Sequence, residues 1–532
     1  MKRYIWKIRR EISLELLCDF VSTTTIAVSP LIVKNVLDGM DNLSLHVLLM
    51  DILAYALLQI ICSLAIYGSM IFTWRGAISF ENNLKKDFFK SLLYLDKEKF
   101  YRKKISEYLS IQNNDITVLE QDGLQPTKDI IKSAVMVLIY AFTIIRFVDY
   151  RLAVLIMFLS AGIVLLTRLY DKELETTRTL YLNQVEKYNK QATSVLENKD
   201  WVNRATVRNI ETEHDTFLNE TSNSRYSYGK SKSIALTAND FSIRSIQTAA
   251  FALAVILLFK NEITIGTAVA TFSYIDSFVS PIGSILYDIG ALKSIKGTSR
   301  KIFSFVNEKC NMECRDNKSN NKEMLLENVC YCVGSNKYQN ISLQIRRGEK
   351  CILRGKNGTG KTTLFNAIQG KIKIEGGEIN ICGLNVRDAF NENVITCINQ
   401  NCKLYVADVK SNISVFQSYP IGELENYREY LPEALFEKLL KNCNGNDATT
   451  LSGGEQQLVL FARMLVQNSP IVLLDEPFSA MDNRTRKQCE EILFSDRFKD
   501  KTVIIITHEN DPEFVQKFDR RIGIENGKVT VA

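Results

Sequence analysis

Apolar residues form long runs in the first 300 positions of the chain and only short runs after them. Six early runs reach or approach the roughly 20 residues that a helix needs to cross a bilayer. The predicted spans are 12–36, 47–74, 130–147, 152–166, 234–259 and 266–292. Buried helices of a soluble core are the alternative, but six such lengths in succession argue against it.

Charge in the connections between these runs predicts their orientation. The first ten residues carry Lys2, Arg3, Lys7, Arg9 and Arg10, and the stretch 85–104 is similarly basic. By the positive-inside rule the N-terminus and the long connections 75–128 and 168–232 lie in the cytosol. Both connections are nearly free of proline and glycine, so we expect them to extend the membrane helices into the cytosol.

The second half of the chain has the pattern of an α/β domain. Residues 341–345 alternate like a strand, and 351–353, 471–474 and 503–506 are continuous apolar runs typical of parallel strands buried on both faces. The predicted fold is therefore an α-helical transmembrane domain with six spans, followed by an α/β P-loop domain. The predicted boundaries are 1–306 for the membrane domain, 307–323 for a polar linker and 324–532 for the α/β domain.

Net charge and cysteine content bear on two questions, nucleic-acid binding and the state of the thiols. A formal charge of +6 is small for 532 residues, so it gives no support for nucleic-acid binding. Ten of the twelve cysteines lie from Cys310 onward, and we expect them to be free thiols. The pairs Cys310/Cys314 and Cys330/Cys332 lack a second Cys or His pair at zinc-finger spacing, so small buried or linker residues are the better interpretation.

The run 355–363 reads Gly-Lys-Asn-Gly-Thr-Gly-Lys-Thr-Thr between apolar flanks, which predicts a phosphate-binding loop between a strand and a helix. Glycines let backbone N–H groups turn toward a polyphosphate, Lys361 supplies a point charge, and the Thr362 hydroxyl can ligate Mg²⁺. The predicted nucleotide-binding residues here are Gly355, Asn357, Gly358, Gly360, Lys361, Thr362 and Thr363.

The apolar run 471–474 ends in two carboxylates, Asp475 and Glu476. Ligands bind at the carboxyl edge of α/β sheets, so we expect Asp475 to hold the Mg²⁺ shell. Glu476 is then placed to orient the water that attacks the γ-phosphate. A solvated acidic turn is the alternative, which the phosphate loop upstream makes less favourable.

The run 451–457, Leu-Ser-Gly-Gly-Glu-Gln-Gln, makes a second anion cradle at the start of a helix. It resembles the signature of the ATP-binding cassette (ABC) family. In that family two cassettes pair head to tail, so the resemblance implies that Ser452, Gly453 and Gly454 close on the nucleotide held by the partner's phosphate loop.

Three further landmarks resemble the same family. By that resemblance Gln400 senses the metal and the membrane domain, Asp482 belongs to the loop that links the two sites, and His508 contacts the γ-phosphate. Gln400 and His508 thus join Glu476 as predicted catalytic residues, and Thr362, Gln400 and Asp475 are the predicted metal ligands. His508 by itself also fits a structural histidine at a strand end.

The whole chain resembles an exporter-type half-transporter, similar to bacterial peptide and multidrug exporters. The resemblance implies a dimer in the plasma membrane, cytosolic cassettes, and ATP with Mg²⁺ as cofactors. Because Glu476, His508 and 451–457 are all intact, a homodimer is favoured over pairing with a degenerate sister chain. Residues 197–217, with Trp201 in the middle, resemble the second intracellular loop, and 106–115 resemble the first. A plain solvated helix is the alternative for each.

The cassette also departs from the family pattern. Val333 stands where an aromatic residue usually stacks on adenine, and Tyr331 lies two residues early. Residues 444–448 lack the usual Gly-Glu-x-Gly, and Leu458 stands where an arginine is common. Adenine stacking is therefore an open question.

Ionisable residues inside spans are costly and usually face a bundle interior or water. Glu15 and Asp19 lie one turn apart in the first span, where contact with Arg9 and Arg10 near the cytosolic interface is favoured over cargo contact. Asp240 and Arg244 are spaced to pair with each other. Asp276 lies deeper, and we expect it to line the transport path.

These features predict ATP-driven export of a small peptide or peptide-like amphiphile. With no protease domain ahead of the first span, we expect this chain not to cleave a peptide cargo. A multidrug or lipid exporter, or an importer with the same fold, is the alternative within the family. A soluble cassette protein conflicts with six spans, and an ATP-gated channel has no need for an intact Glu476 and His508.

Overall fold

A computed structural model describes residues 1–40, 44–307, 324–334, 336–356, 358–400, 402–419, 436–437, 447–507, 511–525 and 528–531. Some side chains within these ranges, that of Asp276 among them, are outside the description. Contacts between Cα atoms divide the chain into two compact units. The first holds residues 1–89 and 109–307, and the second holds 90–108 and 308–532.

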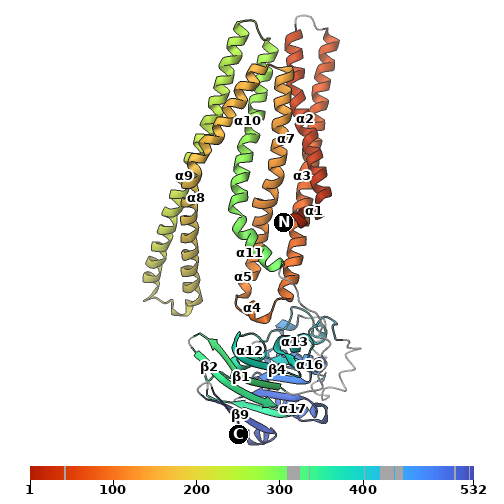
Figure 1. The fold of residues 1–532 in the computed structure, drawn as a ribbon, viewed down its shortest axis with the longest axis vertical. Coiled ribbons are helices and arrows are strands. Elements are labelled where there is room, and N and C mark those ends of the chain that lie inside the picture. Colours follow the sequence, from red (N-terminus) through yellow and green to blue (C-terminus); the bar gives the residue numbers. More distant parts are fainter. Residues whose placement is uncertain are drawn as a thin grey trace. The chain divides into compact units, whose positions relative to one another are not determined.

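The first unit is helical (Figure 1). Its helices are α1 (Lys2–Lys7), α2 (Arg9–Gly39), α3 (Leu45–Leu93), α5 (Ile105–Ser110), α6 (Ile116–Leu119), α7 (Gln125–Phe147), α8 (Tyr150–Glu197), α9 (Val207–Phe259), α10 (Ile265–Ser294) and α11 (Lys296–Val306). Two π-helical turns, Ile111–Asp115 and Glu120–Leu124, join α5, α6 and α7 into one continuous path. Helices α3 and α5 each have one end in the second unit.

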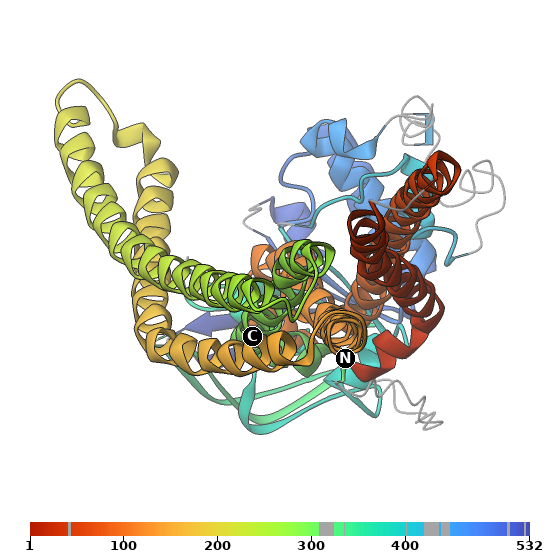
Figure 2. The same cartoon turned by 90° about the horizontal axis from the view of Figure 1, so that it is seen from above.

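The core of this unit lies where α2, α7, α9 and α10 meet. Tyr140, Ile144, Ile246, Tyr274 and Phe278 are buried in one apolar cluster. The Tyr274 hydroxyl donates to the Ala27 carbonyl oxygen at 2.5 Å, which satisfies its only polar group inside that cluster. Helices α8 and α9 pack along each other, and their far end stands apart from α2, α3 and α7 (Figure 2).

Four helical stretches in the described residues are long and apolar enough to cross a membrane: Arg9–Gly39, Leu45–Leu93, Ile105–Phe147 and Val207–Phe259. They contain four of the six predicted spans. The other two predicted spans, 152–166 and 266–292, lie in α8 and α10, where part of the side chains are outside the description. The number six therefore stays a prediction.

The second unit is built on two sheets. An antiparallel sheet has the order β2-β1-β4-β5, with β1 (Met324–Val333), β2 (Asn336–Ile345), β4 (Ile374–Ile381) and β5 (Leu384–Asn385). A six-stranded sheet has the order β10-β9-β3-β8-β7-β6, with β3 (Lys350–Arg354), β6 (Ile395–Ile398), β7 (Ile471–Asp475), β8 (Thr502–Ile506), β9 (Arg520–Glu525) and β10 (Lys528–Val531). All its pairs are parallel except β9 with β10.

The second unit also holds α4 (Lys97–Tyr101), α12 (Lys361–Ile368), α13 (Val386–Asn391), α14 (Val409–Ser414), α16 (Gly453–Gln467), α17 (Asn483–Leu493) and α18 (Pro512–Gln516).

Both faces of the central strands are buried, as their continuous apolar runs predict. Along β7, Val472 and Leu474 join one apolar cluster, whereas Ile471 and Leu473 join the other. Because successive side chains of a strand point to opposite faces, a strand covered on both sides needs apolar residues at every position. The predicted fold class, a helical membrane domain followed by an α/β P-loop domain, is confirmed.

The connection between α3 and α5 contains α4, whose contacts group it with the second unit. The Lys371 ammonium lies 5.0 Å from the centre of the Tyr101 ring. Residues 106–115, which resemble the first intracellular loop of the family, lie in α5 and the first π-helical turn, and their role stays a prediction. Helix α3 ends at Leu93, and the short α4 begins directly after Asp96.

Candidate nucleotide site

The phosphate loop connects β3 to α12, as the sequence predicts. Gly360 is the N-cap of α12 and has φ 102°, a left-handed conformation that favours glycine. The Lys361 ammonium lies inside the loop and donates to the carbonyl oxygens of Gly355 at 2.7 Å and Lys356 at 3.1 Å. Gly355 has no room for a side chain, because an added Cβ would lie 2.7 Å from the Ile524 carbonyl oxygen. The loop therefore presents backbone N–H groups and one cation at a helix N-terminus.

Strand register places the predicted acids at the same edge of the sheet as this loop. Leu353 of β3 pairs with Ile506 of β8, and Ile506 pairs with Asp475 of β7. Two strand spacings, about 10 Å, therefore separate the end of β3 from Asp475. Asp475 is buried.

Glu476 follows Asp475 and is held in an uncommon backbone conformation. Its φ is 49°, and its N–H donates to the Ile506 carbonyl oxygen at 2.9 Å. The Gln400 amide donates to a Glu476 carboxylate oxygen at 3.1 Å. A non-glycine residue with positive φ costs energy and often marks a functional position. Two residues predicted to be catalytic, 76 positions apart, thus meet at the edge of the sheet.

The predicted signature residues lie at the start of α16 and contact a different loop. The Ser452 backbone N–H donates to the Glu455 carboxylate at 3.0 Å and the Glu455 backbone N–H donates to the Ser452 side chain, which together form a capping box. An added Cβ on Gly454 would lie 2.7 Å from the Ala480 carbonyl oxygen. Gln457 also accepts from the Ala480 N–H at 3.0 Å. Ser452, Gly453 and Gly454 thus pack beside the loop that follows β7.

The remaining predicted residues have different outcomes. Asp482 caps α17, since its carboxylate accepts from the Thr485 N–H at 2.9 Å and from the Thr485 hydroxyl at 2.7 Å. Thr362 is exposed at the start of α12, and Thr363 is half-buried. Asn357 and His508 lie outside the described residues. Their predicted roles, like those of the other site residues, stay predictions.

The donor set suits magnesium. Thr362 offers a hydroxyl, Gln400 an amide oxygen and Asp475 a carboxylate, all oxygen ligands of the kind that Mg²⁺ prefers. Within the described residues no three His, Cys, Asp or Glu side chains cluster as a metal cage. Mg²⁺ is usually bound by one or two protein oxygens together with substrate phosphates, so these residues fit it.

The structure bears on the open question of adenine stacking. Tyr331 is only 1% exposed, so its ring has no free face for a base. Val333, at the end of β1, is 42% exposed but aliphatic. Tyr338 of β2, which sequence reasoning missed, packs against the phosphate loop at Gly360. Alternating apolar residues in 341–345 signal a strand there, but they do not say which loop Tyr338 meets.

Leu458 also has a structural explanation. It stands where an arginine is common in the family, and here it is buried in the apolar cluster beneath α16. An arginine in the same helix, Arg463, instead donates to the Asn412 carbonyl oxygen at 2.7 Å.

The described cysteines are free thiols, as expected.

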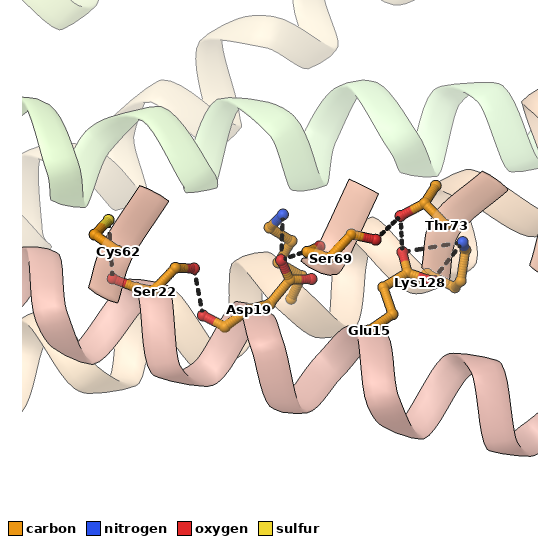
Figure 3. Close-up of polar contacts among 8 residues, drawn as sticks. Glu15, Asp19, Ser22, Cys62, Ser69, Thr73 and Lys128 are labelled. Atoms are coloured by element: carbon orange, nitrogen blue, oxygen red, sulfur yellow. Dashed lines mark hydrogen bonds and ion pairs between the residues drawn. The ribbon is translucent and has the colours of Figure 1, made fainter. Parts of the chain in front are cut away.

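A second set of charged residues lies inside the helical unit and corrects a prediction (Figure 3). The Glu15 carboxylate accepts from the Lys128 ammonium of α7 at 2.9 and 3.0 Å, and from the Thr73 hydroxyl of α3 at 2.8 Å. Asp19 accepts from the Ser69 hydroxyl at 2.7 Å and pairs with Lys132 at 2.9 Å. We call these six residues the α2–α7 charge cluster.

The predicted contact of Glu15 and Asp19 with Arg9 and Arg10 is therefore wrong. Arg10 and Glu15 are five positions apart, which places them on different faces of a helix, whereas positions four apart share a face. Glu15 and Asp19 share one face of α2, and Lys128 and Lys132 are spaced in the same way on α7. The acidic face of α2 therefore packs against the basic face of α7, and each acid pairs with one lysine.

Two other predicted features of the spans differ in outcome. Asp240 and Arg244 form the expected ion pair at 2.8 Å, and both side chains are exposed in the single chain. The side chain of Asp276 lies outside the described residues, so its place on the path stays a prediction.

Comparisons with known proteins agree with this geometry. The family model described as "ABC transporter transmembrane region" matches residues 12–282, and the one described as "ABC transporter" matches residues 338–479. The chain is 30% identical over 291 residues to a lacticin-481/lactococcin-DR transport/processing ATP-binding protein of Lactococcus lactis subsp. lactis. That match covers 51% of this chain and 40% of the lacticin protein, less than half of its length.

A relative of similar length and a solved structure extend the likeness to nearly the whole chain. The ABC transporter ATP-binding protein exp8 of Streptococcus pneumoniae serotype 4 is 22% identical over 543 residues, covering 96% of this chain and 90% of that protein. The structure of a bacterial Atm1-family ABC exporter with ATP bound matches with a TM-score of 0.78 at 17% identity, covering 98% of this chain and 94% of that one. At that identity the likeness is one of fold.

The transmembrane-region match covers half of the chain and the cassette match follows it, on the residues whose geometry is described above. The chain is therefore a membrane-integral, ATP-binding member of the ABC transporter family.

Proposed function

We propose that this chain is one half of an ATP-hydrolysing exporter that moves a small peptide or peptide-like amphiphile out of the cytosol. The observation that carries the proposal is the contact between Gln400 and Glu476 at 3.1 Å, at the sheet edge that also holds the phosphate loop. It supports hydrolysis because Glu476, the residue expected to orient water, and Gln400, the residue expected to sense the metal, are already together.

The chemistry assigned to the site follows from charge and position. Backbone N–H groups at the start of α12 and the Lys361 ammonium bind the phosphates. Thr362, Gln400 and Asp475 would hold Mg²⁺, which would neutralise part of the phosphate charge. The Glu476 carboxylate accepts a hydrogen bond from the attacking water and takes up its proton. Gln400 holds that carboxylate in place until nucleotide and water compete for the amide.

A homodimer is the proposed assembly. Gly453 and Gly454 of the signature pack beside Ala480. In the family picture the signature closes on the triphosphate held by a second cassette, so one chain does not complete a site. The far end of the α8–α9 hairpin supports docking to a partner, because Leu196 and Trp201 there are 72% and 75% exposed. Large apolar side chains left exposed at a tip are a common mark of an interface.

Co-purification tests this assembly. Two copies with different tags, expressed together, should purify as a one-to-one complex with ATPase activity. A stable one-to-one complex with a different half-transporter, in which this chain alone is inactive, would replace the homodimer by a heterodimer.

Coupling between nucleotide and membrane domain is assigned to the α4 segment. Burial, and after it the nearby Lys371 ammonium, lower the pKa of Lys97 to about 8. Lys371 follows α12 closely, so α4 packs within a few residues of the helix that starts at the phosphate loop. A shift of α12 on nucleotide binding would therefore displace α4 as well.

The peptide-like cargo is supported by two observations. The lacticin-481/lactococcin-DR relative is by name a transport protein. Asp240 and Arg244 present both charges on an exposed part of α9, and charged groups of a span face water or protein in preference to lipid. We therefore propose a cargo with polar and apolar parts, and keep Asp276 as a candidate path residue.

Reconstitution tests the proposal. Purified protein in liposomes, with cassettes facing outward, should take up a labelled amphiphilic peptide only with ATP and Mg²⁺, and Asp276→Asn should abolish stimulation of ATPase by that peptide while basal ATPase persists. Stimulation by lipids or drugs but not by peptides would favour the multidrug or lipid exporter. Cargo movement out of such liposomes would favour an importer. The assignment to a bacterial cell membrane is part of the same proposal.

A further inference from the structure

The aromatic ring of Tyr338 lies directly against the phosphate loop. A Cβ added to Gly360 would lie 2.5 Å from Cε1 of Tyr338 and 2.7 Å from its hydroxyl oxygen. Contacts under 3 Å do not occur between real atoms of this kind, so Gly360 and the ring already touch. Gly360 also has a left-handed φ of 102°. Two independent constraints, space and backbone conformation, therefore require glycine at this position.

Tyr338 is itself held by a second ring. It pairs with Tyr331 across the β1–β2 ladder, and the two rings stack with centroids 4.9 Å apart and an angle of 24° between their planes. Tyr338 is 7% exposed and Tyr331 1% exposed. Both belong to the apolar cluster that includes Phe365 of α12. The stacked pair thus joins the antiparallel sheet to the helix that begins at the phosphate loop.

We propose that Tyr338, backed by Tyr331, is a positioning residue for the triphosphate. Its ring sets the place of Gly360, and Gly360 sets the place of the first N–H groups of α12 and of Lys361. The proposal rests on ATP binding by this loop and adds a residue that the phosphate-loop motif does not contain. Displacement of a binding group by even about 1 Å is enough to weaken a site strongly.

Stacking on adenine does not explain Tyr338. One face of its ring is covered by Tyr331, the Gly360 backbone lies against the ring, and little of its surface is exposed. A base-stacking residue needs a free face. The ring is therefore placed to act on the phosphate loop, and its effect on binding should not depend on which base the nucleotide carries.

The test compares Tyr338→Leu, which removes the ring, with Tyr338→Phe, which keeps it. Both are made in the full-length chain carrying Glu476→Gln, so that binding is measured without hydrolysis. Equilibrium binding of ATP, GTP and ADP is measured on folded protein, judged by circular dichroism. We expect Tyr338→Leu to weaken ATP and GTP by the same factor, about tenfold or more. Binding to Tyr338→Phe should stay within about twofold of the parent, because the ring is kept.

A change in the ratio of ATP to GTP affinity would overturn the proposal, because it would mean contact with the base. Equal affinity of Tyr338→Leu and the parent for ATP would overturn it too, since the ring would then be only part of the core. If Tyr338→Leu does not fold, Tyr338→Met, which refills the apolar space with a flexible chain, takes its place in the same comparison. If the parent chain carrying Glu476→Gln did not bind ATP, the ATP site itself would be wrong. The parent measurement therefore separates failure of the proposed function from failure of the proposal for Tyr338.

Discussion

Buried charges are satisfied in different ways in the two units of this protein. In the helical unit Glu15 and Lys128 are 5% and 4% exposed, and they bind each other at 2.9 Å. In the nucleotide unit Lys350 is 8% exposed and donates to the carbonyl oxygens of Gly348, Phe498 and Lys501, at 2.9, 2.7 and 2.8 Å. Lys128 is thus neutralised by an opposite charge, whereas Lys350 is surrounded by backbone carbonyl oxygens.

The difference follows from secondary structure. Inside a helix every backbone carbonyl already accepts a bond from the N–H four residues on, so a buried cation between helices has to find side chains. An α/β domain has strand ends and loops, where carbonyl oxygens are spare. This also explains the candidate site, where Lys361 rests on two loop carbonyls and Glu476 on a neutral amide. Such neutral partners are easily exchanged for phosphate and water.

The variant with the largest expected effect, Glu476→Gln, tests whether the carboxylate held by a neutral amide at the nucleotide site serves hydrolysis. The amide keeps the shape but cannot accept a proton, so we expect ATP turnover to fall by about 10²–10⁴-fold. ATP binding should be retained, measured as nucleotide trapped on the purified protein. Lys361→Ala should lose binding instead, because it removes the cation for the phosphates.

Glu491→Gln is the matched control, since this acid is exposed on α17. It should turn over ATP like the parent chain. Near wild-type turnover of Glu476→Gln would show that another group orients the water.

Lys128→Met tests the α2–α7 charge cluster. It leaves the Glu15 carboxylate buried without its cation, and breaking a buried pair in this way costs about 3–5 kcal/mol. Unfolding of the purified protein in detergent should show that loss. Replacing both partners, Glu15→Leu with Lys128→Met, should recover most of it, because no charge is left uncompensated.

Lys190→Met is the control for this prediction, because Lys190 and Glu186 form a pair whose side chains are 75% and 66% exposed. Breaking this exposed pair should leave the unfolding transition unchanged within error. An equally small effect of Lys128→Met would mean that Glu15 is solvated or protonated in the membrane domain.

Lys350→Met should destabilise less than Lys128→Met. It removes three hydrogen bonds but leaves only neutral carbonyls behind, so we expect a loss of about 1–3 kcal/mol in the unfolding free energy of the cassette. A loss as large as that of Lys128→Met would contradict the view that backbone carbonyls are the weaker partners.

The smallest expected effect is a pH dependence at Lys501. Burial, and after it the nearby Arg497 guanidinium, lower the pKa of this lysine from 10.5 to about 8. Between those values the unfolded chain binds more protons than the folded one, so stability should rise as pH increases from about 8 to 10.5. Below pH 8 the lysine is charged in both the folded and the unfolded chain, and the full cost of burying that charge opposes folding.

Lys501→Met should remove that penalty, so the cassette should be more stable at pH 7 and its stability should vary less between pH 8 and 10.5. Thermal unfolding across this pH range measures both. An unchanged slope would show that Lys501 is charged and solvated in the folded protein.

The sequence by itself was sufficient for features that depend on local pattern. The phosphate loop between β3 and α12, the buried strand that ends at Asp475 and the long apolar helices all follow from residues close together in the chain. Each is governed by short-range chemistry: glycine at positive φ, apolar residues on both faces of a central strand, and apolar length against bilayer thickness.

Only the tertiary structure decided which distant residues meet. Glu15 pairs with Lys128, 113 positions away, and not with the nearby arginines, because helix packing selects the face of α2. Gln400 reaches Glu476, and Tyr338 reaches Gly360, through strand register and sheet packing that no local pattern encodes. Periodicity predicts which face of an element is buried, whereas the partner on that face is set by the topology that brings distant elements together.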